Sequence, residues 1–201
     1  MLARVGAACG EQDDGTEEHA ASHRVIVCVV PRLLIIVTGA PGAGKTTLAE
    51  ALARELGITL IAKDDVKEVL FDSLGTGDRA WSQRLGIASF DLIFLTARRV
   101  LEAGGSCVLE ANFTRAEPVK ALPAERVVQI FCTAPTDVVV ARYGSRVRHP
   151  GHLDAEIVDE LAERLDAGEW QPLALTGVTI TADTTGAVDV AALARRVSQV
   201  E

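Results

Sequence analysis

The chain has 201 residues, 48% of them hydrophobic, and its 20 basic and 28 acidic residues give a formal net charge of −8. This length favours one domain with an appended tail, and the apolar content is ample for its core. The acidity disfavours a dedicated electrostatic nucleic-acid binder, although a local basic groove is compatible with it.

The cysteines and the apolar segments indicate a cytoplasmic protein with no membrane association. The four cysteines are far apart and have no metal-binding spacing, which favours free thiols in a reducing cytosol over a disulfide framework or a zinc site. The apolar run Val25–Val37 is interrupted by Pro31 and Arg32 and is too short to span a membrane. Acidic residues follow Cys9 where a signal peptide would be apolar.

Residues 1–31 are predicted to be an N-terminal extension, and residues 32–201 the domain itself. The Gly, Asp, Glu and Thr residues at 10–18 indicate that much of the extension is disordered. The strand-like run Arg24–Val30 lies within it, and Pro31 restricts that run to the edge of a sheet.

A strand, a glycine-rich loop and a helix open the domain. The apolar run Leu33–Val37 predicts a buried parallel strand, and the helix-forming run TTLAEALARELG predicts a helix with Gly57 as its C-cap. Between them, GAPGAGKTT fits the phosphate-binding pattern G-x-x-x-x-G-K-[ST]. The strand–loop–helix context favours a P-loop over an ordinary glycine-rich turn with a surface lysine.

The residue types of this loop suit a nucleotide triphosphate. Glycines let backbone N–H groups turn inward around phosphate oxygens, and the helix N-terminus adds positive partial charge. We expect Lys45 to reach the β- and γ-phosphates and the Thr46 hydroxyl to ligate Mg²⁺. The predicted nucleotide-binding residues are Gly39, Ala40, Pro41, Gly42, Ala43, Gly44, Lys45, Thr46 and Thr47.

A pair of aspartates follows the second predicted strand, Ile58–Ala62. Asp65 and Glu68 have capping-box spacing, which predicts Asp65 as an N-cap and Asp64 just outside the helix. At the carboxyl end of a strand, Asp64 is a candidate general base for an acceptor hydroxyl; the alternative is helix capping shared with Asp65. Lys67, one turn later, either contacts substrate or pairs with Asp64 on the surface.

Residues 78–103 predict a long amphipathic helix that Gly86 divides. We expect Trp81 and Phe90 to pack in the core or an interface rather than stack on bases. The residues that fall near helical spacing, and are therefore predicted to face the core, are Leu85, Ala88, Leu92, Leu95 and Val100.

The third predicted strand, Ser106–Leu109, ends at Glu110. An acid at the end of an apolar strand after a P-loop is typical of the Walker B position, which helps to hold Mg²⁺. Asn112 and Arg115 lie just beyond it, and either bind substrate or have ordinary turn roles.

The rest of the chain alternates strands and helices around one basic segment. We expect Arg142, Arg146 and Arg148 to close over the phosphates as a lid, and the i, i+4 spacing of Arg142 and Arg146 predicts that these two share a helix face; the alternative is a solvated helix end. Strand–helix alternation predicts a parallel sheet with helices on both faces. The remaining elements are predicted at Arg126–Thr133, Pro135–Tyr143, Asp154–Asp166, Val178–Ala182 and Val188–Val200.

From about Arg32 onward, the segments GAPGAGKTT, KDDVK, VLEANF and ARYGSRVRHPG resemble the small P-loop kinases. These include AAA-type ATP-binding proteins, the 5′-hydroxyl kinase module of polynucleotide kinases, chloramphenicol phosphotransferases and zeta-type toxin kinases. The resemblance implies a three-layer α/β fold with a five-stranded parallel sheet, adenylate-kinase-like, with a helical lid. It implies Asp64 as the general base and Arg142 and Arg146 as the lid pair. Lys67 stands where the family has an arginine, a departure that weakens bidentate recognition of phosphate or substrate.

The resulting hypothesis is a kinase that transfers the γ-phosphoryl group of ATP, with Mg²⁺, to a hydroxyl of a small molecule. In it, Lys45, Asp64, Arg142 and Arg146 are catalytic, Thr46 and Glu110 hold the metal, and Lys67, Asn112 and Arg115 contact substrate. The alternatives are a nucleic-acid 5′-hydroxyl kinase, which the acidity disfavours, and a non-catalytic ATP-binding or ATPase module. An AAA+ motor is disfavoured because only about 155 residues follow the P-loop.

Overall fold

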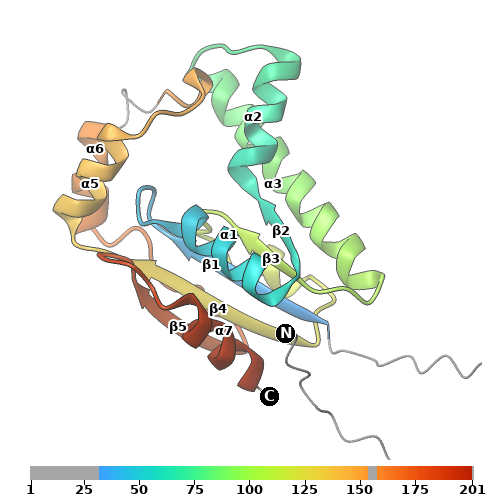
Figure 1. Cartoon of the computed structure of the whole chain (residues 1–201). Helices are drawn as coiled ribbons and strands as arrows, with labels where there is room; N and C mark the ends of the chain where they lie inside the picture. The colour runs from blue at the N-terminus through green and yellow to red at the C-terminus, as the bar shows by residue number, and fades with distance from the viewer. Residues whose placement is uncertain (1–31, 154–157, 201) are drawn as a thin grey trace, which may run out of the picture.

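The computed structural model describes residues 32–153 and 158–200. The N-terminal extension and its strand-like run Arg24–Val30 lie outside these residues. Five parallel strands form one sheet in the order β2-β3-β1-β4-β5, which confirms the predicted five-stranded parallel sheet (Figure 1). The strands are β1 (Leu33–Gly39), β2 (Thr59–Ala62), β3 (Cys107–Glu110), β4 (Arg126–Thr133) and β5 (Val178–Asp183).

The central strand β1 is buried on both faces, as its continuous apolar sequence predicts. Ile35 and Val37 face one hydrophobic cluster, and Leu34 and Ile36 face the other. The first cluster lies under α1 (Lys45–Leu56) and α7 (Val190–Gln199), and the second under α3 (Arg79–Glu102) and α4 (Glu117–Lys120). The domain therefore has three layers, helices on either side of the sheet (Figure 1).

Two further groups of helices rise beyond the carboxyl ends of the strands. α5 (Thr136–Ser145) and α6 (Val158–Asp166) pack together as the helical lid, and α2 (Lys63–Leu74) packs on α3 across from them (Figure 1). Residues 146–153, here called the lid segment, run from α5 to α2 and include the 3₁₀ turn Pro150–His152. Along the described residues, no helix combines the length and apolar character needed to cross a bilayer.

The long helix α3 differs from its prediction in two ways. It is continuous through Gly86, and Asp78 caps its start by accepting a hydrogen bond from the Trp81 backbone N–H. Its buried face also differs in part from the predicted one: Leu85 is buried as predicted, whereas Leu92 and Leu95 are exposed. From Leu85 onward the buried residues recur every four positions, and two of them, Ser89 and Ala97, are small, so a search for large apolar residues does not find this face. They are Leu85, Ser89, Ile93, Ala97 and Leu101.

The start of α2 corrects the capping prediction. The helix begins at Lys63 directly after β2, its N-cap is Ala62, and no side chain caps it. Asp64 and Asp65 both lie in the first turn, where negative charge complements the helix dipole. Asp64 is therefore inside the helix and Asp65 is not its cap, because the chain turns from strand to helix without an intervening residue.

The strand register brings the ends of three strands together. Ala62 of β2 pairs with Glu110 of β3, and Glu110 pairs with Val37 of β1. On the other side of β1, Gly39 pairs with Cys132 of β4. The residues that follow β1, β2 and β3 therefore emerge side by side at one edge of the sheet, where open α/β sheets bind ligands.

Candidate active site

The P-loop forms a tight turn that ends at the start of α1. Gly42 and Gly44 have φ of 84° and 74°, values in the left-handed region that favours glycine. Gly44 is the N-cap of α1, and no side chain bonds the first backbone N–H groups of this helix. Unbonded N–H groups at the start of a twelve-residue helix suit an anion, so the loop fits a phosphate chain.

Not every residue of the motif faces the ligand side. Gly39, at φ 142°, is needed for packing: a Cβ there would lie 2.4 Å from the Cys132 carbonyl oxygen. Ala40 and Ala43 are buried in the core cluster beneath α1. These three predicted nucleotide-binding residues support the loop from behind, because β4 lies directly against its first turn.

Lys45 is buried and turns back onto its own loop. Its Nζ donates a hydrogen bond to the Ala40 carbonyl oxygen at 2.7 Å. Burial lowers the pKa of the Lys45 ammonium, whereas the nearby carboxylates of Glu110 and Asp64 oppose that shift. A buried ammonium beside an uncapped helix N-terminus gives this end of the site concentrated positive charge.

Thr46 and Glu110 meet across the floor of the site. The Thr46 hydroxyl lies 3.4 Å from Glu110 Oε2, and the Glu110 side chain is buried. Burial raises the pKa of the Glu110 carboxyl to about 7. A hydroxyl and a carboxylate are hard oxygen donors, and Mg²⁺ commonly takes one or two protein oxygens beside phosphate oxygens, so the pair fits this metal.

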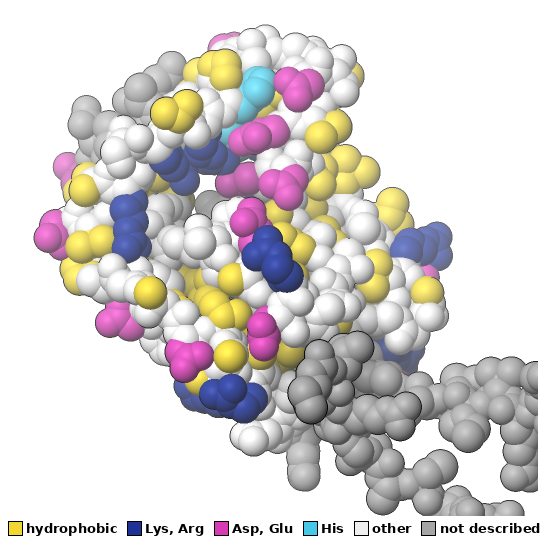
Figure 2. Space-filling view, viewed as in Figure 1, with side chains coloured by type: hydrophobic (Ala, Val, Ile, Leu, Met, Phe, Trp, Pro, Cys, Tyr) yellow, Lys and Arg dark blue, Asp and Glu magenta, His cyan; other side chains and the backbone are white. Residues whose placement is uncertain are grey.

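A cavity of about 380 Å³ opens in front of these residues, between the P-loop, α2 and the lid. Figure 2 shows it as a hollow with basic and acidic side chains around its rim. The titratable side chains that line it are Lys45, Lys63, Asp64, Lys67, Glu110, Arg142, Arg146, Arg148, His152 and Arg164.

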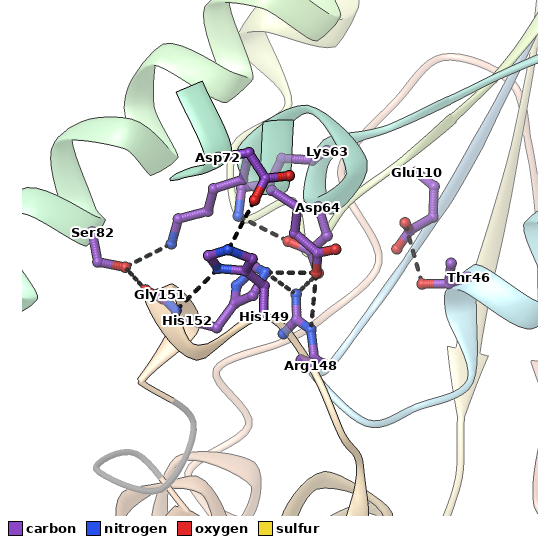
Figure 3. Close-up of polar contacts among 12 residues, drawn as sticks. Thr46, Lys63, Asp64, Asp72, Ser82, Glu110, Arg148, His149, Gly151 and His152 are labelled. Carbon is purple, nitrogen blue, oxygen red and sulfur yellow. Dashed lines mark hydrogen bonds and ion pairs between the residues drawn. The ribbon is translucent and has the colours of Figure 1, made fainter. Parts of the chain in front are cut away.

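Asp64 points into this cavity from the first turn of α2 (Figure 3). Its Oδ1 lies 3.3 Å from Lys63 Nζ, and its Oδ2 lies 2.6 Å from the Arg148 guanidinium. Burial alone would raise the pKa of the Asp64 carboxyl, but the cations around it, Lys63 and Arg148 first, hold that pKa well below its usual range. The group is therefore ionised at neutral pH.

Lys67 reaches the same cavity and is buried, so it is not the surface partner of Asp64 that the sequence allowed. Its Nζ donates to Ser82 Oγ at 2.9 Å, and that hydroxyl donates to the Gly151 carbonyl oxygen at 2.9 Å. The Lys67 ammonium also lies over the Phe71 ring, 5.2 Å from its centroid. Through these contacts Lys67 joins α2, α3 and the lid segment.

The two predicted lid arginines line the cavity but do not share a helix face. α5 ends at Ser145, and Arg146 already has an extended backbone, because Gly144 and Ser145 favour helix poorly. Arg142 donates to the carbonyl oxygens of Thr184 and Thr185, both at 2.9 Å. Arg146 instead lies over the Tyr143 ring, 4.0 Å from its centroid.

Residues 34–167, more than half of the chain, match the model of a family described as AAA domain. A protein from Chloroflexus aurantiacus j-10-fl that has been assigned as a kinase is 38% identical, with a TM-score of 0.74. The match covers 85% of this chain and 98% of that protein. The chain belongs to the small P-loop kinase family.

More distant members of the P-loop kinase fold agree with the architecture. A sugar kinase from Janibacter sp. HTCC2649 is 16% identical with a TM-score of 0.53, over 83% of this chain and 92% of that protein. At this identity the likeness concerns the fold alone.

An uncharacterized protein of Mycobacterium tuberculosis is 31% identical over 146 residues, 65% of this chain. The chain spans 29% of the length of that relative.

The structure also separates the predicted substrate residues. Asn112 lines the cavity, whereas Arg115 is exposed and lies away from it. The sequence predicted Arg148 as a lid arginine but did not indicate its contact with Asp64, and it gave no role to His152. Arg148 and His152 enter the cavity, and Trp170 closes its wall without any sequence signal to mark it.

Proposed function

We propose that this chain is an ATP-dependent kinase that phosphorylates a hydroxyl group of a small molecule, with Asp64 as the general base. The observation that carries the proposal is that the P-loop and the ionised Asp64 line the same cavity. A nucleotide on the loop and an acceptor near α2 would then meet between them. Phosphoryl transfer requires mainly such positioning together with charge stabilisation.

The nucleotide would lie along the P-loop, with its base on the side of Arg142. A second cavity of about 480 Å³ adjoins the first there, with Gly44, Thr47 and Arg142 in its lining. Loop N–H groups and the Lys45 ammonium would hold the phosphates. Lys45 would exchange its bond to the Ala40 carbonyl for one to a phosphate oxygen.

Thr46 and Glu110 would hold Mg²⁺, which neutralises charge on the phosphate oxygens when it is bound. Asp64 would accept a hydrogen bond from the acceptor hydroxyl and take its proton as the new P–O bond forms. Each carboxylate oxygen of Asp64 has a lone pair beyond its contact with Lys63 or Arg148, so it can accept this further bond. Arg146, at the cavity wall, would stabilise charge on the migrating phosphoryl group.

The test is transfer from γ-labelled ATP with Mg²⁺ to a panel of nucleosides, sugars, amino sugars, antibiotics and 5′-hydroxyl oligonucleotides. Asp64→Asn should lower transfer by about 10²-fold or more and leave ATP affinity within about twofold. Asp65→Asn is the matched control, because Asp65 lies in the same turn with its side chain exposed, and it should transfer normally.

Four results would contradict the proposal. Unchanged turnover in Lys45→Ala would exclude the P-loop as the phosphate site. Loss of ATP binding in Asp64→Asn would place Asp64 at the nucleotide rather than at the acceptor. Tight ATP binding with hydrolysis but no transfer to any hydroxyl would favour an ATPase module, and label moved only to oligonucleotides would identify a nucleic-acid kinase.

A further inference from the structure

The guanidinium of Arg148 lies between two carboxylates of α2 that are one helical turn apart. Its Nη2 is 2.6 Å from Asp64 Oδ2, and its Nε is 3.9 Å from Glu68 Oε1. Asp64 and Glu68 are spaced i, i+4, so they project from the same face of α2. One arginine from the lid segment therefore touches the candidate base and the acid beneath it.

His152 completes this arrangement. Its Nε2 lies 3.0 Å from Glu68 Oε1 and 2.9 Å from Arg148 Nη2. A neutral ring with its proton on Nδ1 accepts a hydrogen bond from Arg148, whereas a ring with a proton on Nε2 donates one to Glu68. In either form, His152 is hydrogen-bonded to one of these two side chains. The His152 side chain is only 5% exposed and Arg148 only 17%, which restricts the positions that the guanidinium can take.

Other contacts already attach the lid segment to α2 and α3. His149 lies 3.3 Å from Asp72 (Figure 3). It also stacks on Phe71, with ring centroids 5.1 Å apart. Ser82 donates to the Gly151 carbonyl oxygen. These contacts hold the lid segment without touching Asp64. The contacts among Glu68, His152 and Arg148 are therefore not needed to attach the segment, and their effect is on Asp64.

We propose that Glu68 and His152 are positioning residues that hold the Arg148 guanidinium against Asp64 during phosphoryl transfer. This inference rests on the proposed kinase function and on Asp64 as its base. With Arg148 fixed, the Asp64 carboxylate keeps one orientation, and its remaining lone pairs face the cavity where an acceptor hydroxyl would lie. Glu68 acts on the base only through Arg148, since no direct contact joins the two carboxylates among the described residues.

The first test is a double-mutant cycle read as turnover. Glu68→Gln should lower kcat about tenfold with ATP affinity within about twofold, since a slightly misplaced catalytic group costs about 10²-fold or less. Asp72→Asn is the matched control: it removes an acid of α2 that contacts the lid segment through His149 rather than Arg148, and it should leave kcat within about twofold. In an Asp64→Asn background, Glu68→Gln should have almost no further effect, because the base it positions is gone.

The second readout does not depend on activity. In ¹⁵N NMR spectra, assigned with Arg148→Lys, the Arg148 side-chain signal should show restricted rotation in the wild type and in Asp72→Asn, and free rotation in Glu68→Gln. An unchanged signal in Glu68→Gln would overturn the positioning role, as would equal losses of kcat in Glu68→Gln and Asp72→Asn or multiplicative losses in the cycle. A wild-type chain that transfers phosphate to no acceptor would overturn the kinase function alone.

Discussion

The hydroxyl of Thr184 lies 2.8 Å from the carbonyl oxygen of Ala43, so the loop after β5 is tied to the P-loop. The two residues are 141 positions apart, and Thr184 is buried at their junction. The Thr184 carbonyl oxygen in turn accepts from Arg142. A single threonine thus connects the phosphate-binding loop with a lid residue.

Thr184→Val should weaken nucleotide binding, because it leaves the buried Ala43 carbonyl without its hydroxyl donor and loosens the loop. We expect a stability loss of about 1–2 kcal/mol and a fall in ATP affinity of about fivefold. Calorimetric titration with a non-hydrolysable ATP analogue and urea unfolding measure these two effects. Thr181→Val, on the exposed side of β5, is the control, and equal effects of both variants would refute the role of the hydroxyl.

The stability contributed by Asp64 should depend on pH. The folded pKa of its carboxyl lies below the ordinary 3.8, so this contribution is complete above about pH 4 and is lost as the pH falls through the folded pKa. At pH 7, Asp64→Asn should lower the free energy of unfolding by about 1 kcal/mol, a figure reduced for solvent screening of a side chain that is 38% exposed.

Urea unfolding of the wild type and Asp64→Asn at several pH values between about 7 and 3 provides the measurement. The difference between the two proteins should shrink as the pH approaches 3. A difference that grows on acidification would mean that the folded state binds the Asp64 proton more tightly than the unfolded chain does. That result would contradict a pKa of Asp64 that is lowered by its ion pairs with Lys63 and Arg148.

Gly39→Ala should destabilise the folded chain even when no ligand is bound. The new methyl group would lie 2.4 Å from the Cys132 carbonyl oxygen, and φ of 142° is strained for alanine. A loss of about 2–4 kcal/mol in the free energy of unfolding is expected. Gly186→Ala is the control, since a Cβ there meets nothing within 4 Å. Similar stabilities for the two variants, by thermal or urea unfolding, would contradict the close approach of β1 and β4.

Cys107 and Cys132 should resist alkylation in the folded protein. Both thiols are buried, and burial raises the pKa of Cys107 to about 11 and that of Cys132 to about 12, so almost no thiolate exists near neutral pH. Peptide mapping after iodoacetamide treatment should find both residues labelled in urea and unlabelled without it. Rapid labelling of Cys132 in the folded state would show that β4 opens beneath the P-loop.

Much of the sheet could be predicted from the sequence because local chemistry specifies it. β1 and β3 are continuous apolar runs that only a sheet covered on both faces can bury. The P-loop has few alternative conformations, since its glycines and its lysine–threonine pair suit one turn. Glu110 ends a buried strand, and the register between β1 and β3 then brings it to Thr46.

Two of the predictions that were wrong concern residues at the ends of elements. Asp64 is inside α2 because β2 passes directly into the helix, and the capping-box pattern carries no information on that distance. Arg142 and Arg146 diverge because α5 ends between them. Helix ends depend on small differences in free energy, which tertiary contacts outweigh.

The sequence by itself determined the fold and the phosphate-binding loop, because burial of apolar strands and glycine stereochemistry act over a few neighbouring residues. Only the tertiary structure decided which of the basic side chains of residues 142–152 meet the candidate base. Arg148 reaches Asp64 because the lid segment packs on Phe71 and is held by Ser82. Those partners come from α2 and α3, and their distance from Arg148 along the chain leaves no local pattern to reveal the contact.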